Sequence, residues 1–114
     1  NGWTALMEAC FNGHKDVVHL FLEHSRTNEL NARSNNGFPA IMIACSNGYK
    51  HVVQLFLAHA EKIDLNARSH NGNTAFMWAC SNGRNKDVVK LLLEYSEVVD
   101  INILESFQLP KEIV

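Results

Sequence analysis

Residues 44–48 read ACSNG, and the same five letters return at residues 79–83. Residues 9–13 read ACFNG, which differs at one position. Successive copies are 35 residues apart, and all six glycines follow an asparagine in two interleaved series with this same spacing. A segment that returns at a fixed interval along most of a chain is the signature of a repeat protein. The sequence therefore predicts three tandem copies of one structural unit.

The opening segment of each unit predicts a short helix. Leu6, Ala9 and Cys10 stand at positions i, i+3 and i+4, which places them on one apolar face. In the first and third units a threonine precedes this face at the place of a helix N-cap, and an Asn-Gly pair supplies the residue with positive φ that ends the helix. We expect these helices to begin near Thr4, Pro39 and Thr74.

The segment HKDVVHLFLEH, residues 14–24, predicts a second helix that is apolar around most of its circumference. Its narrow polar stripe consists of Asp16, His19 and Glu23. A helix of this kind must be covered on several sides, so we expect it in the interior of a stack of units, with the stripe facing solvent. Between units, the segments NARSNNG (31–37) and NARSHNG (66–72) predict tight, hairpin-like turns.

These units resemble ankyrin repeats. The family pattern has a glycine in the turn, T-P-L-H at the first helix, Gly-His after that helix, V-V-x-L-L-L in the second helix and a closing asparagine. The matching positions are Gly2, Gly37 and Gly72 in the turns, Gly13, Gly48 and Gly83 within the units, His14, and Asn31, Asn66 and Asn102 at the ends. The resemblance implies an all-α fold, namely an ankyrin-type α-solenoid of stacked helix-turn-helix repeats joined by hairpin-like loops.

The chain departs from the family pattern at the start of the first helix. TALM, PAIM and TAFM stand in place of T-P-L-H, so Met7, Met42 and Met77 replace the histidine. Histidines of the family hydrogen-bond this turn, whereas we expect the methionines to contribute only by packing. The loop after each second helix is also longer than in the family and lacks the usual glycine.

The units and a tail divide the chain into four segments, which are residues 1–36, 37–71, 72–102 and 103–114. The tail departs from the repeats, and two interpretations are open. It forms either a degenerate capping repeat or, since its last letters LPKEIV resemble the opening of an F-box-type motif, the start of another module. The chain begins abruptly at the letters NGW, and we expect it to be part of a longer protein.

Cys10, Cys45 and Cys80 raise the question of a nucleophile or a metal site, because each stands beside an Asn-Gly pair. Neighbouring helices pack about 8–10 Å apart, whereas a disulfide needs Cα atoms within about 7 Å. A nucleophile needs an exposed thiolate with a base, and a zinc ion needs four converging ligands. We expect all three thiols to be buried, unpaired and inert, at a position where ankyrin repeats usually carry a small residue.

Several classes of function find no support in the sequence. It contains no phosphate-binding glycine loop, paired-carboxylate site or Ser-His-Asp set, and the polar stripe of the first unit is not repeated in the others. The net charge of −2 gives no basic footprint, and no apolar run is long enough to span a membrane. We therefore expect no enzyme activity, cofactor, metal, nucleic-acid partner or membrane association. The odd number of cysteines suits a reducing compartment, so we expect an intracellular, cytoplasmic monomer.

The resemblance implies that function lies on the surface, where another protein binds the concave face formed by the turn tips and the exposed side of the first helices. The residues expected there are Arg33, Asn36, Arg68 and His70 at the tips, Trp3 and Phe38 beside them, and Glu8, Ile43 and Trp78 on the helices. Trp3 has a second interpretation, in which an upstream repeat covers it. The alternative function is the recognition arm of a larger enzyme, or of an F-box-like adaptor, whose other domains lie outside this segment.

Overall fold

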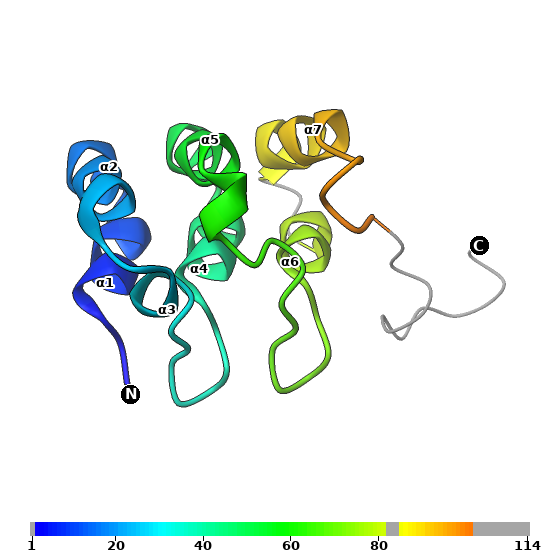
Figure 1. Ribbon diagram of the computed structural model, residues 1–114. Coiled ribbons are helices and arrows are strands. Elements are labelled where there is room, and N and C mark those ends of the chain that lie inside the picture. Colours follow the sequence, from blue (N-terminus) through cyan, green and yellow to red (C-terminus); the bar gives the residue numbers. More distant parts are fainter. Residues whose placement is uncertain (1, 82–84, 102–114) are drawn as a thin grey trace, which may run out of the picture.

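The computed structural model describes residues 2–81 and 85–101, and its regular elements are helices. The first helices of the units are α1 (Ala5–Phe11), α4 (Ala40–Asn47) and α6 (Ala75–Ser81), and the second helices are α2 (Lys15–His24), α5 (Lys50–Ala58) and α7 (Lys86–Glu94). Figure 1 shows three helix pairs side by side, with the second helices in one row, the first helices in a row below and the loops projecting beyond them. This stack is the all-α solenoid that the sequence predicts. The described residues contain no strand, only an isolated bridge between Arg33 and Pro39.

Short helical turns occupy the loops that follow the first two pairs. They are α3 (Thr27–Leu30) and the 3-10 helix η1 (Ala60–Lys62). In α3 the side chain of Glu29 accepts a hydrogen bond from the backbone N–H of Arg26 at 2.8 Å, which satisfies one of the free donors at the start of the helix. The extra loop residues noted in the sequence therefore add a helical turn to these units.

Side-chain caps begin α1 and α6. The Thr4 hydroxyl oxygen accepts a hydrogen bond from the N–H of Met7 at 3.2 Å, and the N–H of Thr4 in turn donates to the Met7 sulfur at 3.4 Å. Thr74 accepts in the same way from the N–H of Met77 at 3.3 Å. The predicted helix starts are confirmed, because the helices begin at Ala5, Ala40 and Ala75. The expectation that methionine contributes only by packing is wrong for Met7, since a thioether sulfur is a weak acceptor that closes this cap.

Glycines with positive φ end the first helices, and their lack of a side chain allows the next unit to pack closely. Gly48 caps α4 in the left-handed conformation, with a φ of 75°. At Gly13, with a φ of 70°, a Cβ atom would lie 2.8 Å from Cε1 of Tyr49 in the following unit. Carbon atoms do not pack so closely, so a side chain at this position would strain the backbone and displace the tyrosine ring.

The first helices form the centre of the core. All residues of α4 from Ala40 to Cys45 are buried, because this helix packs against α1 on one side and α6 on the other. Burial raises the pKa of the Cys10 thiol to about 12, and it raises the pKa of the Cys45 thiol as well. Both thiols are buried and unpaired, as expected.

The expectation of a buried thiol is wrong for Cys80, which is exposed. It occupies in α6 the place that Cys45 occupies in α4. Among the described residues, α6 has a neighbouring first helix only on the α4 side. A position that is covered in the middle unit is therefore open in the last one.

The second helices show a similar difference. In α5 the apolar side chains Val52, Val53, Phe56 and Leu57 are all buried. In α2 only Val18 and Leu22 are buried, while Val17 and Leu20 are exposed. The expectation that residues 14–24 are covered on several sides is wrong for α2, since α2 packs against α1 and α5 but stands at the outer edge of the described stack.

Asparagine side chains connect each unit to the next. Asn31 donates from Nδ2 to the carbonyl of Lys62 at 2.8 Å and accepts at Oδ1 from the N–H of Asp64, also at 2.8 Å. The equivalent bonds one unit later join Asn66 Nδ2 to the carbonyl of Val98 at 3.0 Å and the N–H of Asp100 to Asn66 Oδ1 at 2.7 Å. Both amide groups are thus used across the junction, which fixes the spacing between neighbouring units.

Candidate functional site

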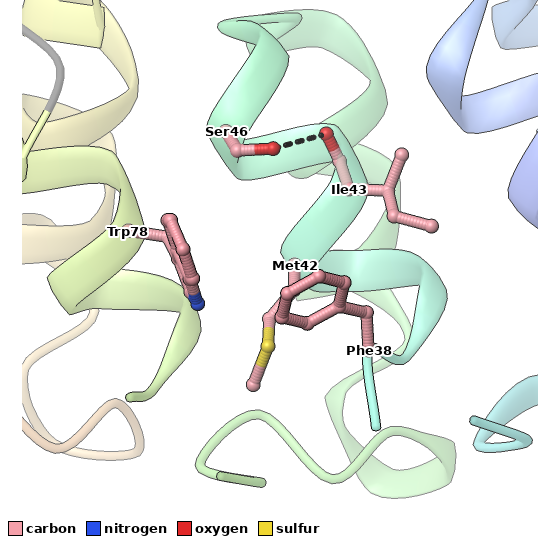
Figure 2. Close-up of a pocket in the computed structure, with 5 residues that line it drawn as sticks. All are labelled: Phe38, Met42, Ile43, Ser46 and Trp78. Carbon is pink, nitrogen blue, oxygen red and sulfur yellow. Dashed lines mark hydrogen bonds between the residues drawn. The ribbon is translucent and has the colours of Figure 1, made fainter. Parts of the chain in front are cut away.

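A small cavity lies between α4 and α6. It has a volume of about 80 Å³ and is lined by Phe38, Met42, Ile43, Ser46 and Trp78. Figure 2 shows the Phe38 and Trp78 side chains on opposite sides of this space, with the Met42 side chain between and below them. The centres of the two aromatic rings are 5.5 Å apart and their planes meet at 87°, an edge-to-face arrangement that aromatic pairs favour. The structure therefore brings three of the expected surface residues together around one cavity.

Ile43 differs from its expected place on an exposed surface. Only 5% of the residue is exposed, because α4 has a neighbouring helix on each side. Ile43 still contributes to the cavity wall, so a ligand would meet it only from inside the cavity. Its backbone carbonyl accepts a hydrogen bond from the Ser46 hydroxyl at 3.2 Å, which leaves that hydroxyl proton committed to the helix (Figure 2).

Trp78 carries an unsatisfied polar group. Its indole Nε1 is buried and finds no hydrogen-bond partner among the described residues. A buried donor without a partner costs about 1–3 kcal/mol. The residue as a whole is half-buried, so part of the ring remains on the surface beside the cavity.

The loop tips adjoin the first helices and are held by backbone hydrogen bonds. The N–H of Ser34 donates to the carbonyl of Phe38 at 3.0 Å, and the N–H of Ser69 donates to the carbonyl of Asn73 at 2.8 Å. Each tip thus closes as the hairpin-like turn that the sequence predicts.

Arginine side chains form hydrogen bonds to the backbone of these tips. Arg33 donates from Nη1 to the carbonyl of Arg68 in the next unit, and Arg68 donates from Nη1 to the carbonyl of Gly72 at 2.9 Å. His70 packs so closely on the preceding tip that a Cβ at Gly37 would lie 2.5 Å from its ring. These bonds orient both guanidinium groups at the tips.

The remaining expected residues lie in different surroundings. Glu8, Arg33, Asn36 and His70 are exposed, while Trp3 and Arg68 are half-buried. Trp3 packs edge-to-face against Phe11, with ring centres 5.3 Å apart, and neither residue lines the cavity. The first unit therefore has an aromatic pair of its own, separate from Phe38 and Trp78.

Met42 lines the cavity although the sequence analysis assigned it to packing, because it stands at the T-P-L-H position. Met7 and Met77 occupy the same position in their units and do not line this cavity. No signal within a single unit could have identified Met42, since the cavity forms only where two particular units meet.

The comparison with protein families supplies the decisive observation. A family model described as ankyrin repeats matches the chain in three copies, over residues 1–68 and 25–105. The chain belongs to the ankyrin repeat family. A comparison with curated proteins finds no match. Ankyrin repeats generally mediate binding between proteins and are typically non-catalytic. The unit boundaries given above stay a prediction, and the tail interpretations fall on residues 103–114, outside the described part of this ankyrin chain.

A second group of polar side chains in this ankyrin stack, His19, Glu23 and His59, lies on α2 and at the C-cap of α5. His59 Nε2 lies 3.5 Å from Glu23 Oε2, and its Nδ1 lies 3.0 Å from the carbonyl of Leu55 near the end of α5. His19 approaches the same Glu23 carboxylate at 3.9 Å. Within residues 2–81 and 85–101, no group of three or more His, Cys, Asp and Glu side chains is arranged to hold a metal ion. None of the helices in these ranges is both long and apolar enough to cross a bilayer.

Proposed function

We propose that this ankyrin array is a non-catalytic module that binds a partner protein on its first-helix face. We use this name for the surface formed by the exposed parts of α1, α4 and α6 together with the tips around Arg33 and Arg68. The observation that carries the proposal is the cavity lined by Phe38 and Trp78, whose half-buried aromatic rings belong to the same face as the arginine-bearing tips. Trp, Tyr and Arg are the residues that most often dominate binding energy at protein interfaces.

A protein is a better match to this face than a nucleic acid or a membrane. Its aromatic rings and arginines share the face with the carboxylate of Glu8, whereas nucleic-acid sites need a dense basic patch. The whole chain carries a net charge of −2. We further propose that the free chain is a monomer and works inside the cell, where its three unpaired cysteines would stay reduced.

The proposal is tested with a purified partner. Proteins retained by the immobilised chain are purified singly and titrated by calorimetry against the parent chain and three variants. Trp78→Ala removes the aromatic wall and is expected to weaken binding by about 2 kcal/mol or more, which is roughly 30-fold. Lys86→Ala and Lys90→Ala each change an exposed residue of α7, which belongs to the second-helix row. Both should alter affinity by less than about threefold.

Melting curves separate binding from folding in this test. If Trp78→Ala unfolds the chain, the conservative variant Trp78→Leu replaces it, because leucine keeps an apolar group against Phe38. A folded Trp78 variant that binds with unchanged affinity contradicts the proposal and places the partner on another surface. An equal loss in Lys90→Ala would also contradict it, since that residue lies on the second-helix row.

The alternative proposal keeps the same surface but gives it a different purpose. In that case the array is the recognition arm of a larger enzyme or of an F-box-like adaptor. Activity assays on the full-length protein, with and without the Trp78→Ala change, would separate a scaffold from a recognition arm.

A further inference from the structure

We propose that Asn71 is a site of spontaneous chemical modification, at which the chain converts this asparagine to aspartate and isoaspartate. Asn71 precedes Gly72 in the tip formed by residues 69–73. The reaction consumes only water and depends on the folded chain itself, so it does not rest on the proposed function. Its product is a carboxylate on the first-helix face, where the newly made chain has a neutral amide.

The chemistry uses atoms of the two adjacent residues. The backbone nitrogen of Gly72 loses its proton to water and attacks Cγ of Asn71. The N–Cγ bond forms, the Cγ–Nδ2 bond breaks, and ammonia leaves with a proton taken back from water. A second water molecule then opens the five-membered imide, at Cγ to give aspartate or at the backbone carbonyl carbon to give isoaspartate. Glycine favours ring closure because it has no Cβ to crowd the attacking nitrogen.

Four Asn-Gly pairs lie wholly within the described residues, and they share one hydrogen bond. In each pair the glycine N–H donates to the carbonyl three residues earlier, at 3.3 Å for Gly13, 2.9 Å for Gly37, 3.3 Å for Gly48 and 2.8 Å for Gly72. This bond must open before the nitrogen can attack. Since the bond is shortest at Gly72, a faster reaction there has to come from the other contacts that hold each pair in place.

The pairs at the ends of α1 and α4 are held by their asparagine side chains. The Asn12 amide donates from Nδ2 to the carbonyl of Glu8 at 2.9 Å, and the Asn47 amide donates to the carbonyl of Phe11 in the first unit at 3.4 Å. Asn47 is also the last residue of α4, so its backbone belongs to a helical turn. Ring closure requires both the side chain and the backbone to rotate, and these contacts oppose that rotation.

The two tip pairs differ in what covers their glycines. Asn36 and Asn71 are exposed, and their side chains form no hydrogen bond within the described residues. Gly37 is buried against the following tip, where a Cβ would lie 2.5 Å from the His70 ring. At Gly72 a Cβ would meet no atom within 4 Å. Among the four pairs, Asn71–Gly72 therefore has the fewest contacts to break when its tip opens.

The product alters this tip in charge and in shape. Each conversion makes the net charge of −2 more negative by one, and it places a carboxylate in the same tip as Arg68, whose Nη1 donates to the Gly72 carbonyl at 2.9 Å. Isoaspartate also adds a carbon atom to the backbone inside the loop that the Ser69 N–H and the Asn73 carbonyl close at 2.8 Å. The first-helix face therefore changes with the age of the protein.

Peptide mapping of the incubated chain tests the assignment. Purified protein is kept at neutral pH, sampled over several weeks, digested under mildly acidic conditions that suppress further conversion, and analysed by chromatography and tandem mass spectrometry. Asn71 should convert roughly tenfold faster than Asn12 and Asn47, and about threefold faster than Asn36. In urea, where tips and helices are unfolded, the four rates should converge.

Variants test the site and the reason for its selection. Asn71→Gln lengthens the side chain, so closure would need a six-membered ring, and the acidic species on isoelectric focusing should largely disappear. The matched variant Asn36→Gln, in the preceding tip, should leave that species in place. His70→Ala removes the ring that covers Gly37 and should speed the conversion of Asn36 about threefold, relative to the same variant in urea.

Three results would overturn the inference. Equal rates at the four pairs in the folded chain would show that the structure does not select Asn71. Conversion of Asn71 in urea but not in the folded chain would show that the tip stays closed. An unchanged rate at Asn36 in His70→Ala would remove cover by the neighbouring tip as the cause of the difference.

Discussion

Helices α2 and α5 carry nearly the same apolar residues in different surroundings. Val17 of α2 is 43% exposed, whereas Val52 at the equivalent place in α5 is 1% exposed. Leu20 is 59% exposed, while its equivalent Leu55 is half-buried. The first unit covers these positions of α5, and the described residues contain nothing that covers them in α2. Burial in a repeat stack is therefore decided by the neighbouring units as much as by the sequence of the helix itself.

Helix α7 shows the same effect on its opposite side. Leu93 is 47% exposed, whereas Leu57 at the equivalent position of α5 is 3% exposed. Val88 of α7, which corresponds to Val52, is fully buried against α5. Each second helix thus has one side for the preceding unit and one for the following unit, and only α5 has both sides covered within the described residues.

The cysteines should give the largest difference between the middle and last units. Cys45 reacts only when its unit opens, whereas Cys80 is exposed in the folded chain. We expect a thiol reagent to modify Cys45 roughly a thousandfold more slowly than Cys80, in line with an opening free energy of about 4 kcal/mol. Mass spectrometry of each cysteine peptide over time measures both rates. Comparable rates in native buffer would mean that the middle unit opens freely.

Phe56 and Phe21 compare the middle and first units directly. Phe56 is fully buried, and Phe56→Ala should lower the free energy of unfolding by about 3–5 kcal/mol. Phe21 is half-buried, so Phe21→Ala should cost about 1–2 kcal/mol. Urea denaturation followed by circular dichroism measures both. Equal losses of stability would show that α2 is covered to the same extent as α5, which would contradict the comparison.

Leu57 and Leu93 make the same comparison for the other side of the second helix. Leu57→Ala leaves a hole between α5 and its neighbours and should cost about 2–4 kcal/mol. Leu93→Ala removes an exposed side chain and should change stability by less than about 1 kcal/mol. A loss at Leu93 as large as that at Leu57 would indicate that part of the chain outside the described residues packs over α7.

Alkaline pH should destabilise the fold through its two buried thiols. Because burial raises the folded-state pKa of Cys10 and Cys45 above the ordinary value of 9.0, the folded chain holds these protons more tightly than the unfolded chain. Their contribution is complete below about pH 9 and is lost as the pH rises above it. Between pH 8 and pH 10 we expect a loss of about 1.4 kcal/mol per thiol. The double variant Cys10→Ala/Cys45→Ala is the control, and an unchanged pH dependence in it would refute this assignment.

The fold could be predicted because each signal is local and repeated. The Asn-Gly pairs, the i, i+3, i+4 apolar faces and the threonine caps identify both helices of a unit without knowledge of its neighbours. The cap at Met7 could not be predicted, because the family comparison assigns that bond to histidine and the sulfur takes it by geometry. Exposure at Cys80 and Val17 could not be predicted either, since the equivalent residues one unit away, Cys45 and Val52, have the same identity and are buried.

The candidate site was only partly predictable for the same reason. Phe38 and Trp78 stood out as aromatic residues that share a predicted face with arginines and small polar residues. Their contact across the boundary between units two and three, and the cavity it leaves, depend on the distance between α4 and α6. Ile43 was expected on the surface because its equivalents are Glu8 and Trp78, yet two flanking helices bury it.

The asparagine bonds between units have a consequence for how such a chain evolves. Asn31 forms hydrogen bonds with the backbone of Lys62 and Asp64 in the second unit. Asn66 forms the equivalent bonds with the backbone of Val98 and Asp100 in the third unit. These backbone partners are present whatever side chain the next unit carries there, except where proline replaces Asp64 or Asp100, because proline has no N–H. Such a junction tolerates substitution in the neighbour without a matching change in the asparagine. Gene duplication or recombination can therefore place one unit after another with these hydrogen bonds formed at once. The exposed residues of each unit can then diverge freely.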